Sequence, residues 1–203
     1  MWNSPANWCA AHPPSDMAQT TVLILPGWQG SGPEHWQMRW AARHGYTVVE
    51  QDDWQRPRRG DWLARLDEVV VDTPRGTNPT HIVLVAHSLG CLQVAAWAAA
   101  SRHTARIRGA LLVAPGDVER PDLREQIPGW APIVRQCLPF PAVLVASRND
   151  PYCSHERARA LATDWGARLV DLGATGHINA DSALGDWPAG HALLQELMNT
   201  TTV

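Results

Sequence analysis

The chain has 203 residues, enough for one ordinary domain with a buried core. Its 17 basic and 20 acidic residues give a net charge of −3 without a basic cluster, which argues against nucleic-acid binding. No run of about eighteen apolar residues occurs, so the sequence predicts no membrane span. Four cysteines stand far apart without C-x-x-C spacing, and we expect reduced thiols, a cytoplasmic location and no zinc site.

Residues 1–19 contain several prolines among mixed polar residues. They lack both the basic start and the apolar core of a signal peptide. We therefore expect a loosely ordered N-terminal extension over residues 1–19, followed by a single domain over residues 20–203.

From residue 20 onward, short apolar runs alternate with amphipathic or Ala-rich segments. The apolar runs predict strands over residues 20–25, 46–50, 82–86, 109–113, 142–146 and 168–172. The other segments predict helices over residues 34–43, 61–72, 91–100, 154–164 and 187–198, with Asp61 as the N-cap of the second helix and a turn over residues 74–80. This alternation is typical of an α/β fold, in which helices cover both faces of a parallel sheet.

Prolines recur through residues 114–141, so this segment cannot form one long helix. It is too short for a domain of its own, and it follows a strand. We expect it to form the rim or a short lid of a pocket.

The segment Ala86-His87-Ser88-Leu89-Gly90 joins a predicted strand to a predicted helix. It is close to the G-x-S-x-G nucleophile elbow, in which a strained turn holds a serine hydroxyl above the edge of a sheet. Gly90 fits this pattern, and Ala86 keeps the first glycine position small. Ser88 is therefore the candidate nucleophile. The alternative is that Ser88 only caps the following helix.

Two further residues with suitable chemistry follow predicted strands. In an open parallel sheet the site lies beyond the carboxyl ends of the strands. Asp150 follows the fifth strand and His177 follows the sixth, which gives the chain order Ser, acid, His of an α/β-hydrolase triad. The imidazole would serve as the base for Ser88, and the carboxylate would fix its tautomer.

Asp117 also follows a strand, and it stays open as an alternative to Asp150, which the Asp-Pro turn favours. The glycines near His177 indicate a loop rather than a strand, which would let the imidazole extend toward Ser88. Three of the other histidines are weaker candidates for the base: His87, expected to point away from an elbow site, His155 at a helix start, and His191 in the last helix.

Several short motifs together give a more specific signal than any one of them. They are Leu25-Pro26-Gly27-Trp28-Gln29-Gly30-Ser31, Glu34-His35-Trp36, Gln51-Asp52-Asp53-Trp54, Ala86-His87-Ser88-Leu89-Gly90, Arg148-Asn149-Asp150-Pro151 and Gly176-His177-Ile178-Asn179. With them, residues 20–197 resemble the small α/β-hydrolase family of serine hydrolases that includes the retinoblastoma-binding serine hydrolase and its bacterial relatives. The resemblance implies a single compact domain without a large cap, with six parallel strands in the order 2-1-3-4-5-6. It also implies a triad of Ser88, Asp150 and His177.

The oxyanion hole of this fold uses the main-chain N–H of the residue after the nucleophile, here Leu89. The second donor comes from the loop after the first strand, where Trp28 is the candidate. Trp36, Trp54 and Trp130 are candidates for the substrate pocket, although Trp36 also fits core packing with Trp40 one turn later.

This triad predicts an esterase-like serine hydrolase that works by two-step acyl transfer through an acyl-enzyme, without a metal or organic cofactor. Because little lid is expected and several tryptophans are candidates for the pocket, we expect small to medium acyl esters as substrates, with amides left open. Two alternatives stay open: a protein-binding module on the same fold with an idle triad, and an enzyme, such as a lyase, that uses the serine only to move protons. The sequence gives no specific sign of a protein partner.

Overall fold

The computed structural model describes residues 20–74 and 82–199. The proposed N-terminal extension over residues 1–19 lies outside the described residues, as does all of the predicted turn over residues 74–80 except its first residue.

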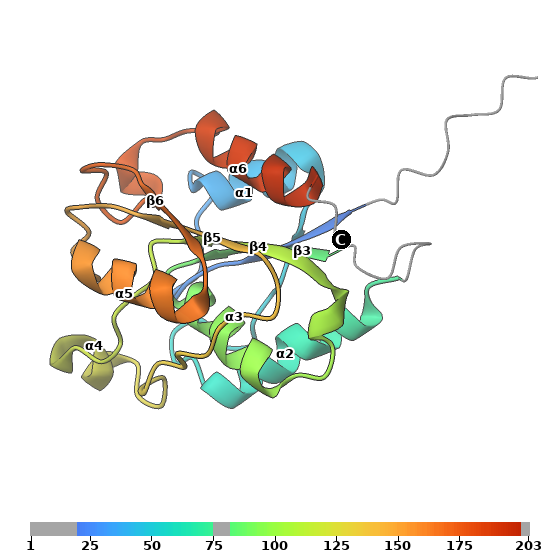
Figure 1. Cartoon of the computed structure of the whole chain (residues 1–203), viewed down its shortest axis with the longest axis horizontal. Helices are drawn as coiled ribbons and strands as arrows, with labels where there is room; N and C mark the ends of the chain where they lie inside the picture. The colour runs from blue at the N-terminus through green and yellow to red at the C-terminus, as the bar shows by residue number, and fades with distance from the viewer. Residues whose placement is uncertain (1–19, 75–81, 200–203) are drawn as a thin grey trace, which may run out of the picture.

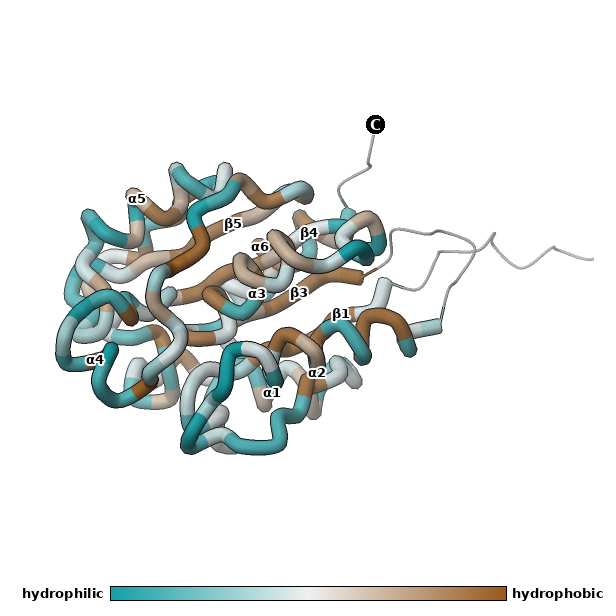
Figure 2. The backbone as a smooth tube through the Cα atoms, turned by 90° about the horizontal axis from the view of Figure 1, so that it is seen from below, coloured by the Kyte–Doolittle hydropathy of each residue, from teal (hydrophilic) through white to brown (hydrophobic). Residues whose placement is uncertain are grey.

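Six parallel strands form one sheet in the order β2-β1-β3-β4-β5-β6, which is the order that the family resemblance implied. The strands are β1 (Thr21–Leu25), β2 (Thr47–Val48), β3 (Ile82–His87), β4 (Ile107–Val113), β5 (Ala142–Ala146) and β6 (Arg168–Asp171). Every residue of β3 and β5 is buried, because helices cover both faces of the sheet. The brown, hydrophobic colour in Figure 2 accordingly runs along these two strands.

Helices form a layer on each side of the sheet, with α1 and α6 on one face and α2, α3 and α5 on the other (Figure 1). Their bounds are α1 (Trp36–His44), α2 (Arg59–Asp72), α3 (Leu89–Ala100), α4 (Pro121–Gln126), α5 (His155–Trp165) and α6 (Pro188–Asn199). The first nine residues of α3 are all buried, because this helix packs against both the sheet and α2. It is the central helix of its layer, and its N-terminus carries the elbow.

Several boundaries differ from the sequence prediction by about two residues, and the start of α2 and the length of β2 are two examples. The α2 helix begins at Arg59 rather than Asp61, and its N-cap is Arg58, whose side chain makes no capping bond. Asp61 instead lies in the first turn, where a carboxylate is stabilised by the positive end of the helix dipole. The edge strand β2 has only two residues, Thr47 and Val48, where the sequence predicts a strand over residues 46–50.

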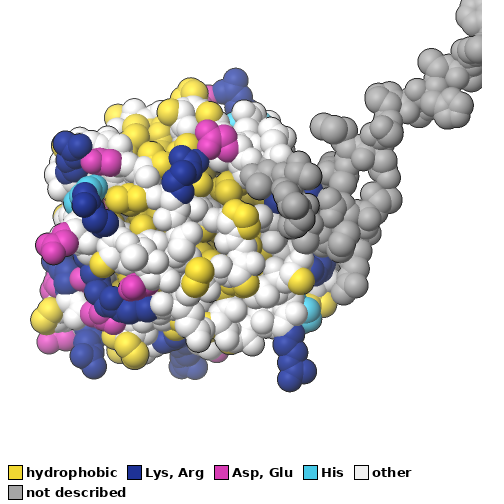
Figure 3. Space-filling view, in the orientation of Figure 1, with side chains coloured by type: hydrophobic (Ala, Val, Ile, Leu, Met, Phe, Trp, Pro, Cys, Tyr) yellow, Lys and Arg dark blue, Asp and Glu magenta, His cyan; other side chains and the backbone are white. Residues whose placement is uncertain are grey.

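The described surface carries charges of both signs. On the face shown in Figure 3, basic and acidic side chains lie among one another. Within residues 20–74 and 82–199, every helix is too short or too polar to cross a membrane.

Candidate active site

Ser88 occupies a strained corner between β3 and α3. Its backbone angles are φ 53° and ψ −119°, a conformation that non-glycine residues rarely adopt. The Ser88 N–H donates to the Val113 carbonyl at 3.0 Å, which ties the corner to β4. The hydroxyl makes no capping bond to α3. Ser88 is therefore the N-cap residue of α3 by position, but its hydroxyl does not cap the helix, and the local geometry is that of a nucleophile elbow.

Two glycines allow the chain to close tightly around this corner. A Cβ atom on Gly90 would lie 2.4 Å from the Leu25 carbonyl oxygen, so α3 could not pack against the end of β1 with any side chain there. A Cβ atom on Gly27 would lie 2.7 Å from the Ser88 Cβ. The loop after β1 therefore runs directly against the serine, and it brings the neighbouring Trp28 main chain to the same place.

His177 links the serine to a buried carboxylate. Its Nε2 atom lies 3.0 Å from Ser88 Oγ, and its Nδ1 atom lies 2.9 Å from Asp150 Oδ2. The side chains of His177 and Asp150 are 9% and 3% exposed. One tautomer satisfies both contacts, because Nδ1–H donates to the carboxylate while Nε2 accepts from the hydroxyl. A polarised serine hydroxyl of this kind can attack a carbonyl carbon.

The loop that carries His177 is tied to the loop after β5. Asn149 Oδ1 accepts from the Gly176 N–H at 2.7 Å, and Ser147 Oγ accepts from the Thr175 N–H at 2.9 Å. Sequence reasoning missed both side chains. Their position just before Asp150 was the available signal, because an acid loop and a base loop that meet need hydrogen bonds between them.

Asp117 has a different environment. Its carboxylate lies 3.2 Å from Arg157 and accepts from the Glu119 N–H at 3.3 Å. Among the described residues, the carboxylate in contact with His177 belongs to Asp150. The geometry therefore favours Asp150 over Asp117 as the partner of the imidazole.

His87 corrects another expectation. Its side chain was expected to point away from the site, yet it lines the same cavity as Ser88. Its Nε2–H donates to the His177 carbonyl at 2.9 Å, and the two rings lie 4.8 Å apart. Burial, with the charge of His177 and His35 as lesser causes, lowers the pKa of His87 well below its usual value. His87 is thus a neutral support beneath the His177 loop.

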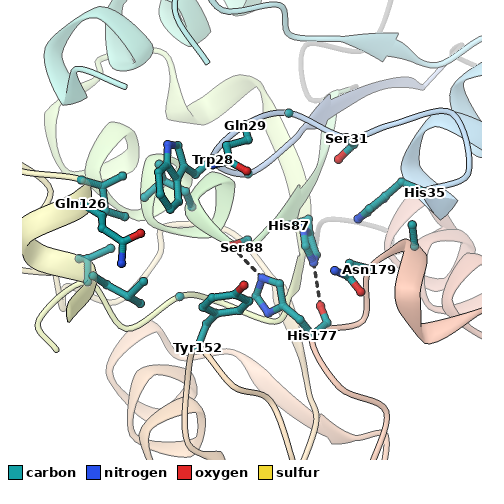
Figure 4. A pocket seen from close by; sticks show the side chains of 18 of the residues that line it. Trp28, Gln29, Ser31, His35, His87, Ser88, Gln126, Tyr152, His177 and Asn179 are labelled. Atoms are coloured by element: carbon teal, nitrogen blue, oxygen red, sulfur yellow. Dashed lines mark hydrogen bonds between the residues drawn. The ribbon is translucent and has the colours of Figure 1, made fainter. Parts of the chain in front are cut away.

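A cavity of about 490 Å³ opens beside Ser88 and His177 (Figure 4). Trp28 and Gln126 lie at one end, and Ser31, His35 and Asn179 lie at the other. The apolar side chains of Val118, Leu123 and Ile127 also line the cavity. These residues belong to the proline-rich segment between β4 and β5, which confirms that it forms the rim of a pocket.

The three other tryptophans proposed for the pocket do not line this cavity. Trp36 is buried between α1 and α6, where its Nε1–H donates to the Ile178 carbonyl at 2.7 Å. Trp130 is buried against Trp62, and its Nε1–H donates to the Pro57 carbonyl at 2.8 Å. Trp54 packs behind Gly30. Trp36 and Trp130 thus belong to the hydrophobic core, where each of their buried indole N–H groups finds a carbonyl acceptor.

Two main-chain amides of the cavity lining lie close to the serine. Leu89 is the first residue of α3, so its N–H lies at the positive end of the helix dipole. Trp28 follows Gly27, whose backbone contacts Ser88. Among the main-chain hydrogen bonds of the described residues, neither amide donates to another backbone carbonyl.

Comparison with known proteins decides the family. Residues 22–196 match the family model described as serine hydrolase. The chain belongs to the serine hydrolase family. A search of curated proteins found no match. Within the described ranges, no group of three or more His, Cys, Asp or Glu side chains is placed to hold a metal ion.

Solved structures of α/β hydrolases share this serine hydrolase fold. A YdeN-like hydrolase from Pectobacterium atrosepticum is 30% identical, with a TM-score of 0.74 over 89% of this chain and 91% of that one. The ydeN gene product of B. subtilis is 20% identical, with a TM-score of 0.70 over 90% and 100% of the chains. A butyrate-bound esterase from Thermogutta terrifontis is 18% identical, with a TM-score of 0.62 over 97% and 86%.

Proposed function

We propose that this serine hydrolase cleaves small to medium acyl esters, with Ser88 as nucleophile, His177 as general base and Asp150 as the carboxylate that orients it. One observation carries the proposal. The Ser88 hydroxyl, the imidazole and the carboxylate form a continuous hydrogen-bonded chain with links of 3.0 and 2.9 Å at the mouth of a cavity.

The reaction would proceed in two steps. Ser88 Oγ attacks the substrate carbonyl carbon as His177 Nε2 takes the hydroxyl proton, and Asp150 stabilises the imidazolium that forms. The amides of Trp28 and Leu89 hold the oxyanion of the tetrahedral intermediate. The intermediate collapses, and His177 returns the proton to the leaving alcohol. Water then attacks the acyl-enzyme by the same route and releases the acid.

The cavity supports a small substrate. Its volume of about 490 Å³ lies within the usual range for small-molecule sites, and Trp28, Leu123 and Ile127 offer an apolar wall for a short acyl chain. The Thermogutta esterase that shares the fold was solved with butyrate bound. An amide bond could be cleaved by the same chemistry, so esters and amides should be compared directly.

The decisive experiment is covalent labelling with a fluorophosphonate, with Ser88→Ala as the control. We expect labelling of the native chain, no labelling of S88A, and a fall in kcat of about a million-fold in that variant. An ester series of increasing acyl length then measures the capacity of the cavity. Labelling that persists in S88A would overturn the nucleophile, and a folded chain that turns over no activated ester would favour a binding module.

We also propose a cytoplasmic location. The three described cysteines are free thiols, and Cys91 and Cys153 are buried. Burial raises the pKa of Cys91 beyond any reactive range and that of Cys153 to about 12, so these two behave as small apolar core residues.

A further inference from the structure

His35 is a buried histidine at the polar end of the cavity. It is the N-cap residue of α1, and its side chain accepts a hydrogen bond from the Gln37 N–H at 3.2 Å through Nδ1. The residue is only 4% exposed, yet it contributes to the cavity lining. The cap therefore fixes the ring in one orientation, with its outer edge toward the cavity (Figure 4).

The capping bond also fixes the tautomer of His35. Nδ1 is an acceptor and so carries no proton. Burial, with the charge of His177 as a second cause, lowers the pKa of His35 to about 4. The neutral ring must then carry its proton on Nε2. Among the described residues, Nε2 is buried without a hydrogen-bond partner. A buried donor without an acceptor costs free energy, so this N–H is available to bind an acceptor atom of a ligand.

The neighbouring polar groups at this end of the cavity are already engaged. Ser31 Oγ donates to Gln37, His87 donates to the His177 carbonyl, and Asn179 Oδ1 accepts from the Asp181 N–H. The described residues that line the cavity include no Lys, Arg, Asp or Glu. A charged group would therefore find no counter-ion here, whereas a neutral oxygen would find the N–H of His35.

We propose that His35 Nε2–H binds a neutral acceptor oxygen of the substrate, so the preferred substrates are esters with an ether, hydroxyl or second carbonyl oxygen near the scissile bond. This inference rests on the proposed function. The ring of His35 lies 4.7 Å from that of His87, which lies 4.8 Å from that of His177. The oxygen would thus sit a few atoms from the carbonyl attacked by Ser88, with the apolar part of the substrate toward Trp28.

The test uses pairs of esters that differ by one oxygen. On the alcohol side, 2-methoxyethyl butanoate is compared with butyl butanoate, and on the acyl side, ethyl 3-methoxypropanoate with ethyl pentanoate. Each ratio of kcat/KM is divided by the same ratio for hydroxide hydrolysis, which removes intrinsic reactivity. We expect the native protein to prefer the ether member of one pair.

His35→Asn is the informative variant, because asparagine also caps helices but places no donor at the position of Nε2. In the preferred pair we expect its ether-to-alkyl ratio to fall about tenfold, the loss of one buried neutral hydrogen bond. Glu34→Gln is the matched control, since the neighbouring Glu34 side chain is 74% exposed and forms its ion pair with Arg39, away from the cavity lining. Its ratio should equal that of the native protein.

Two results would overturn the inference: native ratios that show no ether preference in either pair, or an unchanged ratio in H35N. If H35N does not fold, His35→Ser provides a second capping residue without the donor. Fluorophosphonate labelling is measured on every preparation, and kcat/KM is normalised to the labelled fraction. Normal labelling with no ether preference would reject the role of His35 alone, whereas loss of Ser88-dependent labelling would reject the proposed function itself.

Discussion

The main-chain N–H of Tyr152 donates a 2.8 Å hydrogen bond to Oδ1 of Asp150. The same carboxylate accepts from His177 Nδ1, so both of its contacts require an acceptor. The Tyr152 ring also packs edge-on against His177, with centroids 4.6 Å apart. The short turn from Asp150 to Tyr152 thus contacts both the carboxylate and the imidazole and helps to orient them.

This arrangement predicts a large effect of Asp150→Asn on catalysis. The NH₂ group of the amide would face either the Tyr152 N–H, where two donors would meet, or His177 Nδ1. In the second case Nδ1 would have to accept, so the imidazole would carry its proton on Nε2 and could not take the proton of Ser88. We expect kcat to fall by about ten-thousand-fold with the fold retained. Asp117→Asn is the control, because Asp117 pairs with Arg157 instead. Steady-state kinetics and circular dichroism check both variants, and an equal loss in D117N would contradict the assignment.

The strained backbone of Ser88 predicts a difference between two inactive variants. A residue with a side chain at φ 53° and ψ −119° costs about 1–3 kcal/mol, which glycine avoids. Against this gain, glycine lowers the free energy of unfolding by about 0.5–1 kcal/mol, because its unfolded chain has greater conformational freedom. We therefore expect Ser88→Gly to be more stable than Ser88→Ala by about 1 kcal/mol in urea unfolding. If S88G is no more stable than S88A, the elbow is not strained.

His35 predicts that stability depends on pH. Its pKa is about 4 when folded and 6.5 in the unfolded chain, so between these values the unfolded state binds more protons. The contribution to stability is complete above pH 6.5 and is lost as pH falls toward 4, by about 3 kcal/mol. His87 acts in the same direction. Urea unfolding from pH 7 to 4 should give a shallower decline for H35N than for the native chain, and equal slopes would refute this prediction.

The sheet was predictable because its strands are continuous apolar runs with turn residues between them. Asp150 and His177 were predictable as candidates because parallel strands bring their carboxyl ends to one edge. That the two side chains touch could not be predicted, because their contact depends on how the two loops fold. Hydrogen bonds such as the one from the Gly176 N–H to Asn149 Oδ1 hold those loops together.

Side-chain direction was harder to predict. Trp28 lines the cavity while Trp36 and Trp130 are buried in the core, although all of them lie in or near segments that border the site. Which way an indole points depends on the carbonyl that its N–H reaches, and the sequence does not display that carbonyl. His35 was missed as a binding residue because histidine is not among the favoured N-caps. The direction of His87 was missed because the positive φ of Ser88 rotates the strand end next to it.

The serine and the two groups proposed to activate it follow β3, β5 and β6, and the imidazole is reached only at residue 177. On the ribosome, Ser88 emerges long before its imidazole exists, and until then its hydroxyl is as unreactive as any alcohol. If the proposed mechanism holds, a nascent chain that lacks His177 cannot hydrolyse esters through Ser88. Reactivity toward an acyl donor would arise only once the carboxyl-terminal third has docked.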